Sequence, residues 1–524
     1  MHLLAALVAA TTALSLSHSP ATSVFVSSST GDDGNSGDAP TSAWRSLERV
    51  SAAAPALGAG SSINLLAGDV WTIDTAWFVT DVAGTASAPI ILRAYGASSR
   101  RPAIVRNASV PAAGPTITIN NSSGIVVAGL EVRGGENGLV FTNDVRSGEA
   151  ASTFDYFVVT DCMFSNIRGL HYNASSGSWW GSAIAVAAAH SGVTLTNVNI
   201  SHNLCNASDV FYINSVPYSG WTRSYVAGLL VHANTITHAS YNTLFLDTTA
   251  FVTISRNVFA HNTPQQLFVA GTTDIIMGTL NASVVLLENE ISWRGEYRPG
   301  GPDGCAVDFE TFADGVSFVG NYVYRSFGAG IMVFGHGRSS INLRVANNTM
   351  LYNGCEQTRD DRGGIAFMFT NSSGAIAGNT FATCAGVPLF YAREPGATDG
   401  WTFSDNIIDG TGGVSVAALA PPDISATRGA AGEIVLAGSC PGGGDLRYST
   451  DGARPMPDDA PWPPSGASLT LPPRTVAVNA KCFPPPAGSP AFARLGAALG
   501  ATHIVESPVG GGIFATAPMP VERR

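Results

Sequence analysis

The chain has 524 residues, of which 12% are charged and 45% are hydrophobic, with 58 Gly, 30 Pro and a formal net charge of −11. About a quarter of the residues of an average globular protein are charged, so this composition excludes a disordered chain, a coiled coil and a helical repeat rich in Glu and Lys. Of the 27 basic residues only Lys481 is a lysine, and no basic cluster occurs. We therefore expect neither nucleic acid nor a membrane as a partner.

The N-terminal segment predicts export. Residues 3–16 are almost wholly apolar and small residues follow as far as Ala21, which is typical of a signal peptide over 1–21, although no basic residue precedes the apolar run. No later segment offers 18 uncharged apolar residues for a bilayer. Nine Asn-x-Ser/Thr sequons agree with a secreted glycoprotein. We expect a secreted monomer.

The seven Cys residues are scattered and form no C-x-x-C pair, which argues against both a disulfide scaffold and a zinc site. A few buried thiols with one or two disulfide bonds is the expected arrangement. Cys440 with Cys482 is the first choice for a pair, and Cys355 with Cys384 is the second because the repeat places them on adjacent turns.

A short pattern repeats through the middle of the chain: an apolar residue, any two residues, Asn, any one residue, and an apolar residue. A second apolar run follows each copy, as in residues 243–247, 267–269 and 306–309. Short strands at this period predict a parallel β-helix with coils about 4.8 Å apart. We expect the Asn to adopt the left-handed bend between strands and its amide to bond the Asn of the next coil. The Asn residues are 234, 257, 289, 321, 348, 379 and 406, and Val198, Cys162 and Leu130 occupy the same position in weaker copies.

Residues 22–415 resemble the right-handed parallel β-helix proteins of the pectate-lyase-like superfamily. The opening strengthens the resemblance, because GDDGNSG at 31–37 and WRSL at 44–47 are similar to the capping segment of many secreted β-helix proteins. A short amphipathic helix near Leu47–Leu57 would plug the open end of the apolar core. The resemblance implies an all-β fold with an N-terminal cap helix, and it names no reaction.

The repeat stops near Ala420, where Pro and Gly become frequent. The stretches YSTDGARP at 448–455 and SLTLPPRTVAVNAKCF at 468–483 resemble the small C-terminal β-sandwich attached to chitobiase-type and other carbohydrate-active enzymes. The resemblance implies an accessory domain over about 425–510.

Three coils carry long insertions. The interval from the Asn position to the next strand is 18 residues after Asn289, 17 after Asn348 and 22 after Cys162, against 10 in other coils. Insertions on one edge of a solenoid usually mark the binding face. Charge is concentrated there, with eight charged residues in 288–310.

The strand at 306–310 carries a carboxylate pair. Val307 and Phe309 match the apolar positions of neighbouring coils, so Asp308 and Glu310 should point outward, about 6.6 Å apart at Cα. Their expected neighbours are mostly apolar, with Phe268 one coil below. Two carboxyl groups at such a distance can act as acid and as base or nucleophile in glycosidic cleavage. Outward carboxylates on an exposed strand more often only increase solubility.

Three functions remain open. The first is a glycoside hydrolase in which Asp308 and Glu310 are catalytic and Asp303 assists. The second is a polysaccharide lyase in which the same three residues bind Ca²⁺ and an Arg or His removes a proton; the third is a non-catalytic protein that binds glycans of a cell wall or matrix. His336 lies in a Gly-His-Gly similar to a polygalacturonase motif, but the Asp pair expected on a preceding coil is absent. The candidate substrate-binding residues are Arg298, Glu296, Tyr297, His336, Phe334, Arg359, Arg362, Trp179 and Trp180.

Overall fold

The computed structural model describes the β-helix and part of the C-terminal region. The described residues are 21–107, 114–167, 182–188, 192–206, 211–214, 225–237, 239, 243–260, 275–277, 281–292, 304–310, 313–335, 339–356, 362–408, 423–428, 434–439, 445–450, 461, 469–471, 477–483, 501–506 and 513–516.

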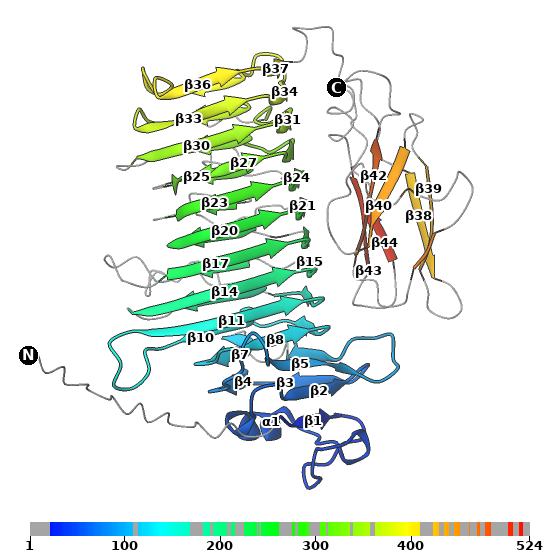
Figure 1. The fold of residues 1–524 in the computed structure, drawn as a ribbon. Helices are drawn as coiled ribbons and strands as arrows, with labels where there is room; N and C mark the ends of the chain where they lie inside the picture. The colour runs from blue at the N-terminus through cyan, green and yellow to red at the C-terminus, as the bar shows by residue number, and fades with distance from the viewer. Residues whose placement is uncertain are drawn as a thin grey trace, which may run out of the picture.

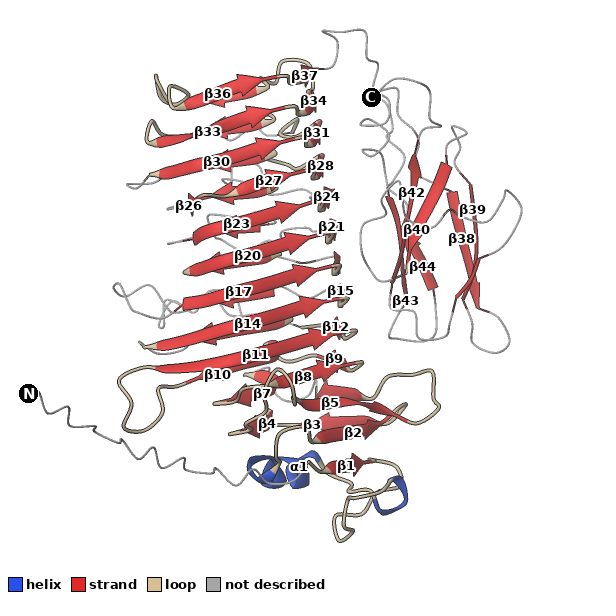
Figure 2. Cartoon of the chain, viewed as in Figure 1, coloured by secondary structure: helices blue, strands red, loops and turns tan. Residues whose placement is uncertain are grey.

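The strands from β1 to β37 form three parallel sheets that wind into one β-helix (Figures 1 and 2). Successive coils each add a strand to each sheet, so strands that are neighbours in a sheet are usually three apart in the chain. This confirms the parallel β-helix expected from the repeat.

The first sheet holds the longest strands of the described residues: β1 (Ser23–Val26), β2 (Ser62–Leu66), β5 (Ile90–Tyr95), β8 (Ile125–Ala128), β11 (Ser152–Thr160), β14 (Val193–Ser201), β17 (Tyr225–His232), β20 (Thr249–Ser255), β23 (Asn281–Leu287), β26 (Ala313–Asp314), β27 (Ser317–Val319), β30 (Ser340–Ala346), β33 (Ser372–Ala377) and β36 (Trp401–Ser404).

The second sheet is built from short strands: β3 (Val70–Ile73), β6 (Ala103–Arg106), β9 (Glu131–Arg133), β12 (Met163–Ser165), β15 (Leu204–Asn206), β18 (Thr235–Thr237), β21 (Val258–Ala260), β24 (Glu290–Ser292), β28 (Tyr322–Tyr324), β31 (Thr349–Leu351), β34 (Thr380–Ala382) and β37 (Ile407–Ile408).

The third sheet completes each coil: β4 (Trp77–Thr80), β7 (Pro115–Asn120), β10 (Asn137–Asn143), β13 (Ile184–Ala188), β16 (Phe211–Asn214), β19 (Leu244–Asp247), β22 (Ile275–Met277), β25 (Val307–Phe309), β29 (Ile331–Val333), β32 (Ile365–Phe367) and β35 (Phe390–Ala392).

The interior of the β-helix is a single apolar core that runs from Val24 to Trp401. Each strand alternates its side chains between this core and the outer surface, as in β20, where Val252 and Ile254 are buried and Thr253 lies between them. Burying a row of β-branched and aromatic side chains along every coil is the main source of stability for such a stack.

A ladder of buried Asn side chains connects the coils at the bend between the first and second sheets. The side chain and backbone N–H of Asn257 both donate to Oδ1 of Asn289, at 2.9 and 3.0 Å, and Asn289 donates in the same way to Asn321. The pattern extends from Asn203 to Asn406, so the expected Asn–Asn bonds are confirmed.

The left-handed bend, however, does not fall on the Asn, and this expectation was wrong. The residue immediately before each ladder Asn has the positive φ: 55° at Arg256, 55° at Glu288 and 66° at Gly320. The bend at that residue turns the following Asn inward, where its amide reaches the next coil.

Two positions of the repeat also differ from the sequence pattern. Asn203, not Val198, occupies the ladder position in its coil, since it donates to Asn234 and accepts from the backbone N–H of Cys162. The strand expected at 267–269 lies outside the described residues, and β22 is the strand that pairs with β19 and β25. Because β22 has only three residues (Ile275–Met277), its sequence is as short and apolar as the run at 267–269, and the pattern alone does not tell the two apart.

The N-terminal cap contains the expected helix, α1 (Leu47–Ala53), followed by the 3-10 turn η2 (Ala54–Ala56). Ser46 caps it by accepting from the backbone N–H of Arg49, and Leu47 and Val50 are buried against the first coils. Another 3-10 turn, η1 (Pro40–Ser42), precedes it. The helix lies at the N-terminal end of the stack (Figure 1). No helix of the described part is long and apolar enough to cross a membrane.

The C-terminal region holds two small antiparallel sheets, which fits the expected β-sandwich. The first orders its strands β38-β39-β41 and the second β40-β42-β43-β44, with β38 in contact with β44. Their bounds are β38 (Asp423–Arg428), β39 (Ile434–Ser439), β40 (Asp445–Ser449), β41 (Leu469–Leu471), β42 (Ala477–Phe483), β43 (Ala501–Glu506) and β44 (Ile513–Thr516).

The ladder makes a prediction for stability. Asn289→Ala should lower the free energy of unfolding by about 2–4 kcal/mol, because it leaves buried donors of Asn257 without their acceptor. Asn342→Gly is the control: Asn342 is exposed with φ 56°, a conformation that Gly adopts freely, and its amide makes one exposed hydrogen bond, to Asp314, so the change should stay within about 1 kcal/mol. Urea unfolding measures the free energy of unfolding of both variants. Equal unfolding midpoints for Asn289→Ala and Asn342→Gly would contradict a stabilising role of the Asn ladder.

Candidate functional site

The long insertions all leave the β-helix at one edge. The segments 168–181, 293–303 and 357–361 each follow a strand of the second sheet and precede a strand of the third. The segment 261–274, between β21 and β22, crosses the same edge, so a fourth insertion joins the three expected from the sequence. These segments lie outside the described residues, but the strands that flank them fix the edge.

Asp308 lies on the outer face of the third sheet next to this edge. Its neighbours Val307 and Phe309 belong to the interior core, so the expected outward direction of Asp308 is confirmed. It is nevertheless only 1% exposed. Within the third sheet Asp308 pairs with Ile276 of the preceding coil, in place of the expected Phe268, and with Met332 of the following coil.

A second apolar cluster explains part of this burial. We call it the outer cluster: it lies outside the interior core and consists of buried residues from the coils of β25, β29 and β32, with three half-buried aromatic residues against them. The buried members are Cys305, Ala329, Met332, Ala366 and Met368, and the aromatic members are Phe334, Phe369 and Tyr391.

Glu310 follows β25 and is partly exposed. The extended backbone places its Cα about 6.6 Å from that of Asp308, so the two carboxylates belong to the same face of the sheet. Phe334 is in register with Glu310 one coil further on. Phe309 pairs with Val333, and the backbone N–H of the next residue, Phe334, donates to the carbonyl oxygen of Phe309. One carboxylate is therefore embedded and its partner faces the outside.

Asp247 was not recognised as a site residue from the sequence. It follows Leu246 in β19 as Glu310 follows Phe309, and Leu246 and Phe309 are in register through Met277 of β22. Asp247 and Glu310 thus hold equivalent positions two coils, or about 9.6 Å, apart. The stretches TLFLD at 243–247 and VDFE at 307–310 both end in an acidic residue. This equivalence becomes visible in the sequence once β22 is taken as the strand between them.

Arg362 begins the described stretch that leads into β32. It is half-buried, and its Nε has no hydrogen-bond partner among the described residues. The following residue, Gly363, accepts from the backbone N–H of Gly330 and so holds this corner against the preceding coil. Arg362 is therefore a donor that a ligand at this edge could satisfy.

Most of the other candidates lie outside the described residues. Of the substrate-binding set, Phe334 and Arg362 are described, and the structure brings Phe334 next to the carboxylate pair. No three His, Cys, Asp or Glu side chains of the described residues converge as a metal site. The candidates outside the described residues are Asp303, Arg298, Glu296, Tyr297, His336, Arg359, Trp179 and Trp180.

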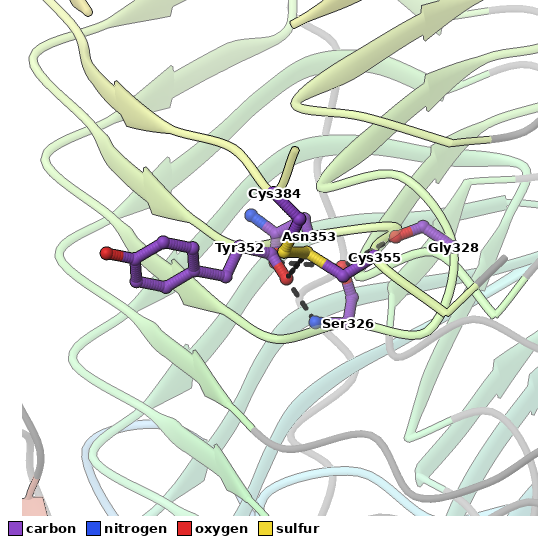
Figure 3. The surroundings of a disulfide bond; sticks show 6 residues. All are labelled: Ser326, Gly328, Tyr352, Asn353, Cys355 and Cys384. Carbon is purple, nitrogen blue, oxygen red and sulfur yellow. Dashed lines mark hydrogen bonds between the residues drawn. A yellow bond between two sulfur atoms is a disulfide. The ribbon is translucent and has the colours of Figure 1, made fainter. Parts of the chain in front are cut away.

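A disulfide bond fixes the base of the insertion at 357–361. Cys355 and Cys384 lie on adjacent coils with their Cα atoms 5.7 Å apart, which confirms the second of the two expected pairs (Figure 3). Next to it the backbone N–H of Ser326 donates to Oδ1 of Asn353 at 3.0 Å. The first-choice pair cannot be assessed, because Cys440 lies outside the described residues.

The free thiols of the described residues are buried, two in the interior core and one in the outer cluster. They belong to Cys162, Cys205 and Cys305. Burial raises the pKa of Cys162 to about 12, so this thiol stays protonated and unreactive at neutral pH. The free thiols of the described part thus have a packing role.

Comparison with known proteins identifies relatives of the fold. No protein-family model matches the chain. A stretch of 90 residues, 17% of the chain, is 40% identical to the lacto-N-biosidase of Bifidobacterium longum subsp. longum, and the match spans only 6% of that protein.

Two crystal structures of a GH136 lacto-N-biosidase from Eubacterium ramulus share the fold. The selenomethionine derivative superimposes with a TM-score of 0.52 at 16% identity and the native protein with 0.53 at 15%. Each match covers 74% of this chain, and it covers 67% and 68% of those chains, respectively. At this identity the likeness establishes a shared β-helix architecture.

The disulfide leads to a prediction. Cys384→Ser should lower the free energy of unfolding by about 3–4 kcal/mol, because the bond closes a loop between residues 29 apart and so restricts the unfolded chain. Dithiothreitol should shift the urea midpoint of the wild type and leave that of the variant unchanged. A variant that unfolds at the wild-type midpoint would show that this bond does not stabilise the stack.

Proposed function

We propose that the protein is a glycan-active enzyme, a glycoside hydrolase in which Asp308 and Glu310 carry the chemistry. The observation that carries the proposal is the burial of Asp308, which is 1% exposed although it points away from the core. A solubilising carboxylate has to be exposed to water, and embedding one costs free energy of folding. A role in solubility therefore does not account for Asp308.

The chemistry follows from the pair. One carboxyl group protonates the oxygen of the scissile glycosidic bond, and the other attacks the anomeric carbon or removes a proton from the attacking water. Side chains that start about 6.6 Å apart can span either the short separation used with retention or the longer one used with inversion. NMR of the first-formed anomer distinguishes the two.

The surrounding residues support substrate binding at the same place. Phe334 adjoins Glu310, and Arg362 offers a donor at the edge from which the insertions leave. We assign Asp303 an assisting role, and the remaining candidates of the insertions the role of holding the glycan. The lacto-N-biosidase names of the matched proteins support a glycan as the substrate. Secretion through the segment 1–21 and a monomeric state belong to the same proposal.

The central prediction concerns the pair itself. Glu310→Gln and Asp308→Asn should each lower kcat by about 10²–10⁴-fold on the glycan that the wild type cleaves best, because each removes a proton-transfer or nucleophilic group. Asp405→Asn is the matched control: it changes an exposed carboxylate in a left-handed turn and should leave kcat unchanged. Full activity in both carboxylate variants would refute the assignment.

The products separate hydrolysis from the other functions. A hydrolase releases reducing ends without near-ultraviolet absorbance across a panel of neutral and acidic glycans. Unsaturated, absorbing products that a chelator abolishes would instead establish the calcium-dependent lyase, and binding without any product would establish a non-catalytic glycan-binding protein.

A further inference from the structure

The aromatic members of the outer cluster form a strip that the carboxylate chemistry does not use. Phe334, Phe369 and Tyr391 are half-buried and pack over the buried methionines of the cluster. We propose that these three rings are a subsite for an uncharged pyranose of the substrate, running from Glu310 towards the C-terminal end of the β-helix. This inference rests on the proposed function, since it takes Asp308 and Glu310 as the point of cleavage.

The register of the third sheet places the strip. Phe334 lies one coil beyond Glu310 at the equivalent position. Tyr391 lies three coils beyond Asp308, through the pairs Asp308 with Met332, Met332 with Ala366, and Ala366 with Tyr391. At about 4.8 Å per coil, Tyr391 lies about 14 Å beyond Asp308 along the axis, and the strip from Phe334 to Tyr391 spans about 9.6 Å. The strip therefore begins one coil beyond Glu310 and is long enough for more than one sugar ring.

The rings have a fixed arrangement. Phe334 and Phe369 meet edge to face, with centroids 5.2 Å apart and planes at 72°. Beneath them Met332 is 2% and Ala366 0% exposed, so the support is packed while the rings remain accessible. The apolar C–H face of a pyranose stacks on such rings while its hydroxyl groups stay in water.

The charge of the strip selects among sugars. Its outward positions between Glu310 and Tyr391 are uncharged, with Met332, Phe334 and Met368 among them. An anionic sugar would need a cation to replace its lost water. Arg393, at the equivalent position one coil beyond Met368, is exposed and is followed by the half-buried Glu394. These outward positions supply no cation, so the strip favours neutral residues over uronates, whereas Arg362 lies outside the strip at the edge before β32.

Binding by the full-length chain tests the subsite. Calorimetry in the Glu310→Gln background, with neutral oligosaccharides of increasing length, should show at least about fivefold weaker binding for Phe369→Leu, which keeps an apolar side chain and loses the ring. Phe369→Tyr should bind as the parent does. Phe78→Leu is the control, since Phe78 is a 48% exposed phenylalanine of the same sheet far from the carboxylates.

Each outcome decides the inference. Unchanged affinity in both Phe369→Leu and a second variant, Tyr391→Leu, overturns the subsite, and so does a polyuronate that binds as tightly as the neutral glycans. Wild-type unfolding midpoints exclude misfolding as the cause of a loss. If Glu310→Gln abolishes turnover while Phe369→Leu keeps the wild-type KM, only the subsite fails. If Glu310→Gln keeps turnover, the proposed function fails whatever the binding shows.

Discussion

The vertical Asn ladder is the interaction on which the rest of the structure depends. In a parallel β-helix every coil must turn at the same places. The backbone N–H and C=O groups of each turn lie at the edge of the apolar core and need hydrogen-bond partners there. Asn257 and Asn289 do so by donating to the Asn of the next coil and to a backbone carbonyl of the preceding coil. Each coil is thereby fixed in register with its neighbours.

That register is what allows the third sheet to build a site from distant parts of the sequence. Asp247, Glu310 and Phe334 hold equivalent positions along the third sheet although 87 residues separate the first from the last. The insertions leave from one edge for the same reason, since every crossing from the second sheet to the third occurs there. A rigid stack can carry such variable segments without losing its core.

Because of the outer cluster, the third sheet carries buried apolar residues on both of its sides. Its inner side belongs to the common core, and its outer side carries a smaller apolar layer beside a buried carboxylate. A purely structural sheet would present polar residues to water at Met332, Ala366 and Met368. Their burial next to Asp308 supports the proposed substrate site, and the half-buried rings of Phe334 and Phe369 fit the proposed sugar subsite.

The repeat alone determined the architecture. Apolar positions at a short fixed spacing and an Asn that recurs in each coil admit few solutions other than stacked strands, and the amphipathic stretch near Leu47–Leu57 indicated the cap helix. The same alternation determined that Asp308 points outward. What the sequence could not decide depends on contacts between coils. The burial of Asp308, the register of β22 and the equivalence of Asp247 and Glu310 arise when residues far apart in the chain are stacked. The apolar pattern of a three-residue strand fits more than one register until its hydrogen-bonded neighbours fix it.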